Sequence, residues 1–213
     1  AIVAAEDAGF YGHVGVSMTR VLVTAVEDVI KRRMAGASTL TMQLARGLFL
    51  TPEKTPERKI KEALLALQIE KRYTKREIFT FYANQIYLGH GAYGVEAASR
   101  MYFGKRSKDL TLEEAALIAG IIQLPQRQSP FVDVRRATGR RNYVLRQMAE
   151  EKYITREEAE AASRQPVVAR GQPRADESIA PFFVEEVRKY LERKYGARQL
   201  YEKGLSVETS LDP

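Results

Sequence analysis

Two stretches of the chain carry side chains that could perform chemistry. The first begins with the adjacent carboxylates of Glu6 and Asp7 and continues through Phe10 to His13, one of the two histidines in the chain. A carboxylate in such a setting could act as a general acid or base. The same residues also fit a solvated helix end followed by a loop whose phenylalanine anchors the core, so this stretch alone leaves both interpretations open.

The second stretch carries opposite charges at helical spacing. In a helix, Arg58 and Glu62 lie one turn apart, and Lys59 shares their face. Two cations oriented by a carboxylate could hold a phosphate. The alternative is a surface ion pair, which stabilises a helix only weakly.

Two further groups could contact a polar ligand. Ser38 and Thr39 precede a helical segment that contains Gln43, and hydroxyls with free N–H groups at a helix start suit a sugar or a phosphate. An N-cap cluster is the alternative. Asn84 and Tyr87 could line a sugar groove. The apolar residues around them are expected in the core: Ile78, Phe81 and Ile86.

The elements that must position these side chains are helices nearly throughout, because apolar residues recur at helical spacing. Three capping boxes, each a threonine followed three residues later by a glutamate, mark helix starts at Thr74, Thr111 and Thr155. One predicted helix places Ile60 and Leu64 on the same apolar side. Helices are predicted over residues 1–8, 16–34, 55–73, 74 to about 88, 134–153 and 181–195. Loops are predicted over 125–130 and, around a short helix, over 89–109.

A change in composition between residues 165 and 174 predicts a domain boundary. Residues 1–165 form the expected first domain. Residues 166–213 are expected to hold a linker, the last helix and a strand over 205–211, where apolar and polar residues alternate. A lone strand suggests the entrance to a second domain outside this chain, and the start at Ala1 within a helical pattern suggests a piece of a longer protein.

Composition excludes several chemistries. The 213 residues include no cysteine, which excludes disulfides and thiolate nucleophiles, and two histidines are too few for a three-histidine zinc site. The net charge of +7 favours anionic partners: nucleic acid, anionic lipid or a phosphorylated substrate. No apolar run reaches the roughly 20 residues that span a bilayer, and no signal-peptide pattern is present.

In their order along residues 1–165, these stretches resemble the peptidoglycan glycosyltransferase domain of class A penicillin-binding proteins. The first and third motifs of that family are met in full, the second has Leu40 and Met42 in place of Ile and Gln, and the fourth has Phe79 and Ala83 in place of Leu. The five motifs match at Glu6, Asp7, Phe10, His13 and Gly15; at Gly36, Ser38, Thr39, Thr41 and Gln43; at Arg58, Lys59 and Glu62; at Lys75, Ile78, Tyr82, Asn84, Tyr87 and Gly89; and at Ala116, Leu117, Ala119, Gly120 and Pro125.

The resemblance implies an all-α, lysozyme-like fold and an enzyme that joins lipid II into glycan strands. The donor is the growing strand on undecaprenyl pyrophosphate, the acceptor is the 4-hydroxyl of a GlcNAc, and transfer inverts the anomeric carbon. Glu6 would be the catalytic base and Glu62 a second catalytic carboxylate with an orienting or electrostatic role. Arg58 and Lys59, with Arg46 as a weaker candidate, would stabilise the pyrophosphate. The remaining substrate-binding candidates are Asp7, Phe10, His13, Ser38, Thr39, Gln43, Asn84 and Tyr87, with Asp7 also expected to anchor its loop.

The resemblance also implies partners and a location. No cofactor is required, although Mg²⁺ could assist at the pyrophosphate, and no residue is assigned to a metal. The partners would be lipid II, the growing glycan strand and the membrane surface, where the helix over 16–34 could lie, but not nucleic acid. A transpeptidase domain would follow in the full-length protein. The location would be the outer face of the bacterial cytoplasmic membrane, with an anchor outside this chain.

Two other functions stay open at this level. A lytic transglycosylase or lysozyme-like muramidase would share the fold and need one catalytic glutamate. The Arg58, Lys59 and Glu62 face argues against it, because cleavage of a glycosidic bond needs no pyrophosphate clamp. A non-catalytic basic binding module is the second alternative, against which the basic residues are spread among acidic ones and match no nucleic-acid motif.

Overall fold

The structure is a computed structural model that describes residues 1–16, 38–50, 55–170, 181–195 and 209. The chain divides into two compact units, Ala1–Gly171 and Gln172–Pro213. Nearly all of the helix predicted over 16–34 and of the strand predicted over 205–211 lies outside the described residues.

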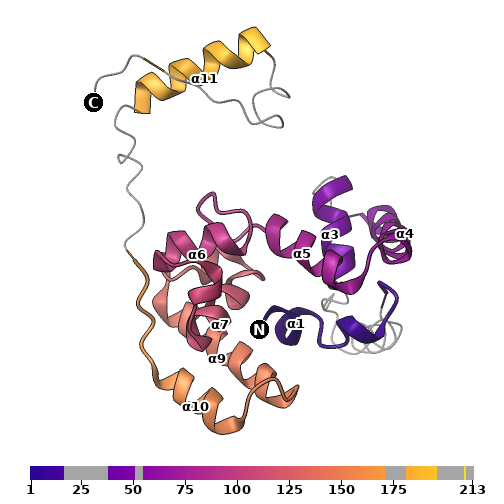
Figure 1. The fold of residues 1–213 in the computed structure, drawn as a ribbon, viewed down its shortest axis with the longest axis vertical. Coiled ribbons are helices and arrows are strands. Elements are labelled where there is room, and N and C mark those ends of the chain that lie inside the picture. Colours follow the sequence, from indigo (N-terminus) through magenta and orange to yellow (C-terminus); the bar gives the residue numbers. More distant parts are fainter. Residues whose placement is uncertain (17–37, 51–54, 171–180, 196–208, 210–213) are drawn as a thin grey trace. The chain divides into compact units, whose positions relative to one another are not determined.

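The first unit is built from helices (Figure 1). The prediction of an all-α fold is confirmed, because the β structure of the described residues is limited to one isolated bridge, between Tyr87 and Tyr93. In chain order its elements are α1 (Ile2–Glu6), the 3-10 turn η1 (Phe10–Gly12), α3 (Leu40–Phe49), α4 (Pro56–Arg72), α5 (Lys75–Gln85), α6 (Val95–Phe103), the 3-10 turn η2 (Ser107–Asp109), α7 (Leu112–Ile121), α8 (Pro125–Gln128), α9 (Val134–Glu150) and α10 (Arg156–Arg164).

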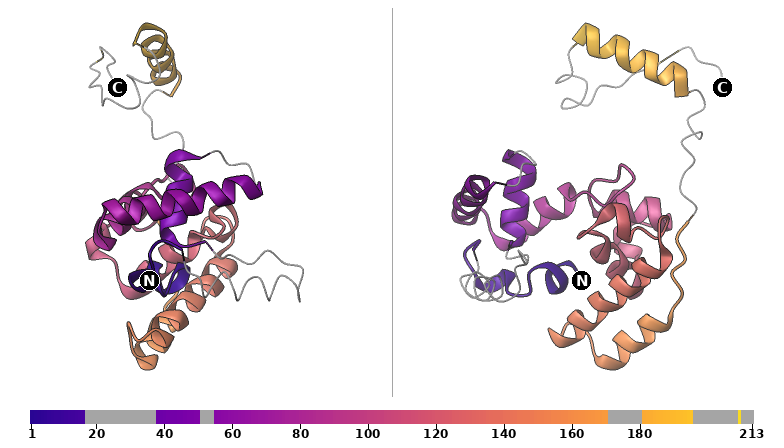
Figure 2. Two further views of the ribbon diagram at one scale, coloured as in Figure 1. Left: turned by 90° about the vertical axis from the view of Figure 1, so that its right-hand side faces the viewer. Right: turned by 180° about the vertical axis from the view of Figure 1, so that it is seen from behind.

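These helices form two groups, with the N-terminal segment between them (Figure 1, Figure 2). In one group α3 packs against α4 and α5, and in the other α7 and α10 pack against α9. Helix α1 contacts α7 and α9. Phe10, which follows α1, is fully buried, and Lys75 Nζ of α5 lies 4.5 Å from its ring centre. The first residues of the chain therefore connect the two groups.

Local sequence explains where most helices begin. Thr74 and Thr155 each accept a hydrogen bond from the backbone N–H three residues on, and their own N–H groups donate to Glu77 and Glu158. The Thr111 N–H donates to the Glu114 carboxylate in the same way, at 2.9 Å. The three predicted capping boxes are confirmed.

The predicted ends of two helices are wrong. Helix α9 ends at Glu150 rather than at residue 153. Helix α5 ends at Gln85, not near residue 88, because Ile86 takes an extended conformation and its carbonyl accepts from the Gly94 N–H at 2.8 Å. Gly94 has a φ of 83°, and a Cβ there would lie 2.7 Å from the Asn84 carbonyl oxygen. A glycine is therefore needed for the chain to turn back at this point. The loop predicted over 125–130 contains the short helix α8.

Two packing predictions also fail. Ile60 and Leu64 of α4 are 62% and 56% exposed, because α4 buries the side that carries Glu62, Ala66 and Ile69. Phe81 was expected in the core but is exposed, with its ring edge-on to Tyr73. Ile78 is fully buried, as predicted.

In the second unit, the helix predicted over 181–195 is confirmed as α11 (Pro181–Tyr195).

Candidate active site

The carboxylate of Glu6 is held from both groups of helices. Glu6 is the last residue of α1 and its side chain is 13% exposed. Its Oε2 accepts a hydrogen bond from Gln43 Nε2 of α3 at 3.2 Å. Its Oε1 lies 3.6 Å from Nη2 of Arg140 on α9. The carboxylate is thus anchored by a neutral donor and a cation while part of it remains accessible to a ligand.

Gln43 is held in turn by a buried phenol. Tyr82 OH of α5 donates to Gln43 Oε1 at 3.0 Å. Burial, and after it the negative charge of Glu6, raise the pKa of the Tyr82 phenol, while Arg46 acts in the opposite direction. The phenol therefore stays protonated at neutral pH.

Glu6 faces a cleft of about 380 Å³. Its walls come from α1, the start and middle of α3, the end of α7, and α9. The lining residues are Ala5, Glu6, Ser38, Gln43, Arg46, Ile122, Gln123, Arg140 and Tyr143. A larger hollow of about 420 Å³ lies between α9 and α10, but none of the predicted site residues lines it. The chemistry predicted from the sequence therefore maps to the smaller, more polar cleft.

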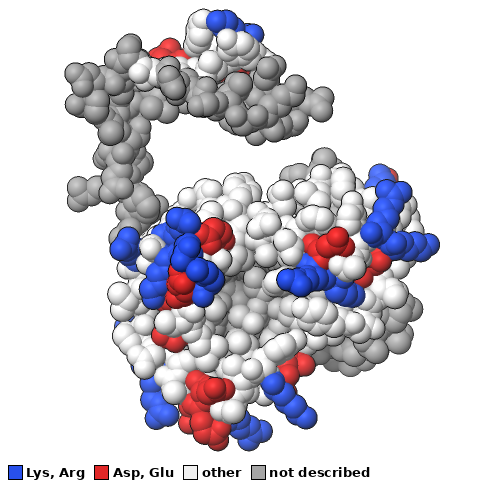
Figure 3. All heavy atoms as spheres, viewed as in Figure 1, with Lys and Arg blue, Asp and Glu red and all other residues white. Residues whose placement is uncertain are grey.

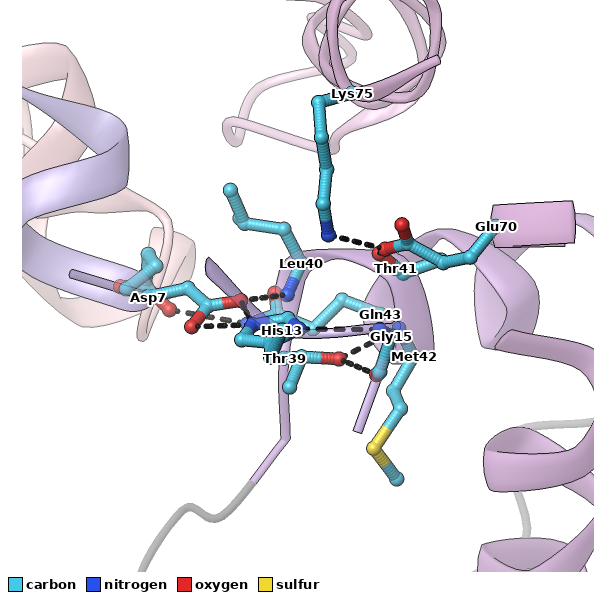
Figure 4. A network of polar contacts seen from close by, with 11 residues as sticks. Asp7, His13, Gly15, Thr39, Leu40, Thr41, Met42, Gln43, Glu70 and Lys75 are labelled. Atoms are coloured by element: carbon cyan, nitrogen blue, oxygen red, sulfur yellow. Dashed lines mark hydrogen bonds and ion pairs between the residues drawn. The ribbon is translucent and has the colours of Figure 1, made fainter. Parts of the chain in front are cut away.

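Asp7 and His13 connect the first motif, residues 6–15, to the second motif at the start of α3 (Figure 4). The Asp7 carboxylate, 1% exposed, accepts from the Leu40 N–H at 3.0 Å and contacts His13 Nε2 at 2.9 Å. His13 Nδ1 accepts from the Gly15 N–H at 3.1 Å, which assigns the ring proton to Nε2 and makes His13 a donor to Asp7. Asp7 thus anchors its loop at the start of α3.

Thr39 completes this connection. Its side chain donates to the Gly15 carbonyl at 2.5 Å and accepts from the Met42 N–H at 3.2 Å, so it caps α3. Thr39, Phe10 and Met42 are all buried and none of them lines the cleft. Departure from the family pattern at Met42 therefore leaves the cleft lining unchanged.

The charged face of α4 is buried at its centre. Glu62 is fully buried and forms ion pairs with Arg58 and, at 3.0 Å, with Lys59. The interpretation of this cluster as a surface ion pair is therefore wrong. Lys59 Nζ also donates to the hydroxyl of Ser38, which lines the cleft. The cluster thus reaches the wall of the cleft through Ser38.

Two guanidinium groups each have one N–H donor without a hydrogen-bond acceptor in the described part of the chain. Arg58 Nε and Arg140 Nε are buried and have no hydrogen-bond partner within the described part of the chain. Buried donors of this kind are normally satisfied by protein, water or ligand. Arg140 lines the cleft, whereas Arg58 does not.

Asn84 and Tyr87 are not brought to the cleft. Asn84 is exposed at the end of α5. The Tyr87 hydroxyl accepts from Gln126 Nε2 at 3.1 Å, and its ring lies 4.9 Å from that of Tyr93. Arg46, by contrast, lines the cleft with Glu6.

The structure adds cleft residues that the sequence did not reveal. Arg140 contacts Glu6, and its guanidinium carbon lies 4.4 Å from the ring centre of Tyr143, which also lines the cleft. Gln123 lines it from the end of α7. The sequence carries no signal for Arg140, only one for the neighbouring Arg141, which lies outside the cleft lining and falls at helical spacing with the apolar Val144, Leu145 and Met148. An arginine on the apolar side of a helix indicates a buried, specific contact.

No group of three side chains suited to a metal ion occurs within the ranges that the structure describes. In the same residues, no helix is long and apolar enough to cross a membrane.

Charged side chains do not separate by sign on the face drawn in Figure 3, where Lys and Arg lie beside Asp and Glu. Within the fold, opposite charges also pair along a helix, as Arg100 does with Glu96 at 2.8 Å and Lys61 with Glu57 at 2.7 Å. Among the described residues drawn in Figure 3, no extended basic stripe of the kind that tracks a nucleic-acid backbone is visible.

Comparison with known proteins gives a consistent result. A family model described as Transglycosylase matches residues 1–149. The chain is 44% identical over 213 residues to penicillin-binding protein 1A of Aquifex aeolicus and 43% identical over 215 residues to penicillin-binding protein 1A of Vibrio cholerae. It is 40% identical over 218 residues to penicillin-binding protein 2D of Bacillus subtilis. All three alignments cover 100% of this chain but only 29%, 26% and 31% of those proteins.

A solved structure agrees. The crystal structure of penicillin-binding protein 1A from Haemophilus influenzae matches with a TM-score of 0.50 and 31% sequence identity. The match covers 75% of this chain and 20% of that one.

Proposed function

This chain belongs to the transglycosylase family, and from that premise we propose that it polymerises lipid II into glycan strands as the glycosyltransferase domain of a class A penicillin-binding protein. The observation that carries the proposal is the position of Glu6, which shares its cleft with Ser38, the residue that the cationic cluster of α4 contacts. In this proposal the base lines the cavity, and the cations that would hold the departing anion reach its wall through Ser38.

Glu6 acts as the base in this proposal. Its carboxylate removes the proton from the 4-hydroxyl of the acceptor GlcNAc while the oxygen of that hydroxyl attacks the anomeric carbon of the donor. The bond from that carbon to the pyrophosphate oxygen breaks, with inversion, and undecaprenyl pyrophosphate leaves. Gln43 and Arg140 hold the carboxylate in place during the transfer.

Lys59 and Arg58 stabilise the charge of the departing pyrophosphate. Lys59 is 42% exposed, and its ammonium lies between Glu62 and Ser38. Glu62 is fully buried, so we assign it the role of orienting the two cations. Arg46 adds positive charge from α3.

We assign Mg²⁺ no role in the proposed glycosyl transfer. The two carboxylates of this region already face cations, Glu62 towards Arg58 and Lys59, and Glu6 towards Arg140. They do not fit a protein-held metal centre, and the charge of the pyrophosphate is assigned to side chains instead.

Several predicted contacts receive a different role. Asp7, Phe10, His13 and Thr39 have their polar or aromatic groups engaged by the protein, so we propose that they shape the cleft rather than touch the substrate. Asn84 and Tyr87 lie outside the cleft and are proposed to stabilise the turn after α5. Ser38, Gln43 and Arg46 remain the proposed substrate contacts with Arg58 and Lys59.

We further propose that the full-length protein lies in the bacterial cell envelope with its substrate at the outer face of the cytoplasmic membrane, and that it carries a transpeptidase domain after this chain. The likeness to proteins named penicillin-binding protein 1A supports the location, and the length of those proteins beyond the matched region supports the further domain.

The test compares Glu6→Gln with Glu114→Gln. Glu114 is similarly buried, with 16% exposure, and is paired with Lys105, but it lies outside the cleft. With labelled lipid II in detergent, the wild type and Glu114→Gln should form long glycan, and Glu6→Gln should lose at least about 100-fold in rate. Full activity in Glu6→Gln would exclude Glu6 as the base.

A further inference from the structure

We propose that Tyr82 is a positioning residue for the reaction: its hydroxyl fixes the Gln43 amide in the orientation that presents the NH₂ group to Glu6. The inference rests on the proposed function of Glu6 as the base. It assigns the hydroxyl of Tyr82 a role that the packing of its ring does not require.

The three residues form a directed chain of hydrogen bonds. Tyr82 OH donates to Gln43 Oε1 at 3.0 Å, and Gln43 Nε2 donates to Glu6 Oε2 at 3.2 Å. An ionised carboxylate can only accept, so it needs the nitrogen end of the amide. The reversed amide would turn its oxygen towards the carboxylate and repel it.

Tyr82 selects between these two orientations because of its burial. Its side chain is 2% exposed, so a hydroxyl hydrogen without an acceptor would be costly. In the observed orientation that hydrogen has Gln43 Oε1 as its acceptor, and in the reversed orientation it would face an NH₂ group. The raised pKa of the phenol keeps this donor present across the working pH range.

Three other side chains of the described residues that lie near Glu6 make different contacts. Arg140 approaches from α9 and contacts the other carboxylate oxygen, with Tyr143 against its guanidinium. Arg46 lines the cleft from α3, and Asp7 follows Glu6 but turns towards His13 and Leu40. Within the described part of the chain, the hydrogen bond to Gln43 Oε1 comes from α5 alone.

The chain offers a matched control in Tyr102. It is fully buried, and its hydroxyl donates to the Leu88 carbonyl at 2.8 Å, away from the cleft lining. Tyr82→Phe and Tyr102→Phe each delete one buried hydroxyl and keep the ring. A general loss of stability should therefore affect both variants, whereas a loss of positioning should affect only Tyr82→Phe.

The experiment measures lipid II polymerisation in both variants, with thermal unfolding to confirm that each is folded. Tyr82→Phe should lower kcat about tenfold with little change in KM. The acidic limb of its pH profile should move to higher pH, because a carboxylate that loses a donor takes up a proton more readily. Tyr102→Phe should keep the wild-type kcat and pH profile.

A double-mutant cycle then asks whether Tyr82 acts through Gln43. Tyr82→Phe should cost no further activity in a Gln43→Met background, because the amide that it orients is gone. Equal effects of Tyr82→Phe and Tyr102→Phe, or full additivity with Gln43→Met, would overturn the inference.

A readout without turnover separates this inference from the proposed function. The carboxyl band that is present in the wild type and absent from Glu6→Gln can be followed by infrared difference spectroscopy. In Tyr82→Phe this group should take up its proton at higher pH than in the wild type, and in Tyr102→Phe it should not. If this titration is the same in Tyr82→Phe as in the wild type, the inference is overturned, even if the wild type polymerises lipid II. If the titration moves in Tyr82→Phe but the wild type makes no glycan, only the proposed function is contradicted.

Discussion

At the scale of single residues, the site depends on contacts that cross between the two groups of helices. Glu6 ends α1, yet its carboxylate contacts Gln43 of α3 and Arg140 of α9. Gln43 lies 37 residues from Glu6 along the chain, and Arg140 is more distant still. A small shift of either group would therefore move the base relative to its donors.

Arg140 provides a direct test of this arrangement. We expect Arg140→Met to lower kcat/KM for lipid II by about 10- to 100-fold, since it removes the cation beside the base and an unused donor in the cleft. Arg136→Met is the control, one turn earlier on α9, because Arg136 is exposed and pairs with Asp133. Comparable losses in the two variants would point to helix stability instead.

Gly15 is predicted to be needed for the loop of the first motif, which carries Asp7 and His13, to take its folded conformation. Its φ is 92°, and a Cβ would lie 2.8 Å from Glu70 Cγ and 3.0 Å from the Ala66 carbonyl oxygen. Gly15→Ala should lower the free energy of unfolding by about 2 kcal/mol or more. Gly12→Ala, where a Cβ would meet nothing within 4 Å, should unfold at nearly the wild-type temperature.

At the scale of elements, α9 contributes one side chain to the cleft and another to the end of α10. Arg140 faces Glu6, and the next residue, Arg141, is 1% exposed and donates to the carbonyls of Ser163 and Gln165 at 2.7 Å. Burial lowers the pKa of Arg141, and the charge of Glu113 opposes this effect. One turn of α9 therefore supports both the base and the end of α10.

Arg141→Met should destabilise the chain because it leaves two carbonyls at the end of α10 without their donors. We expect a loss of about 2–4 kcal/mol in urea unfolding. Arg146→Met, on the exposed side of the same helix, should change the free energy of unfolding by less than about 0.5 kcal/mol. A loss of the same size in Arg146→Met would contradict the assigned role of Arg141.

Helix α6 carries a carboxylate whose effect depends on pH. Glu96 accepts hydrogen bonds from the Ser107 N–H and Arg100, and these contacts, the first above all, lower its pKa to about 2. Because the folded-state pKa lies below the ordinary value of 4.5 for a glutamate, the stabilisation is complete above pH 4.5 and disappears as the pH falls towards 2. The Glu96→Gln variant should be less stable than the wild type at pH 7, and acid titration followed by circular dichroism should show the difference shrinking below pH 4.5.

Helix starts could be predicted from the sequence because their signals are local. The capping boxes at Thr74, Thr111 and Thr155 need only residues within one turn. The end of α5 could not be predicted in this way, because it depends on Gly94 folding back onto Ile86. The buried side of α4 could not be predicted for a similar reason: α4 packs against α3 and buries Glu62 and Ala66, while Ile60 and Leu64 stay exposed.

The candidate site was predicted in part. Glu6 and Gln43 are assigned from the family motifs and the cluster around Glu62 also from its helical spacing, and the structure brings the first two into contact. Arg140 could not be found, because its charge resembles that of Arg135 and Arg136 on the same helix. Only the fold shows which of these arginines faces the cleft.

At the scale of the whole molecule, the prediction of a lysozyme-like helical domain is confirmed by the family model and by the solved penicillin-binding protein 1A structure. The boundary predicted at residue 165 stays a prediction; the first compact unit runs to Gly171. Residues 165–170 lie in that unit, where the Arg170 N–H donates to the Tyr102 carbonyl at 2.7 Å.

The central claim is that this cleft synthesises glycan rather than cleaving it. The most direct measurement incubates the chain with lipid II and, in parallel, with purified peptidoglycan, and separates both sets of products by size. The account predicts long glycan from lipid II, with one undecaprenyl pyrophosphate released per bond formed, and no soluble fragments from peptidoglycan. Soluble fragments from peptidoglycan without polymer from lipid II would contradict it and assign the cleft to a muramidase.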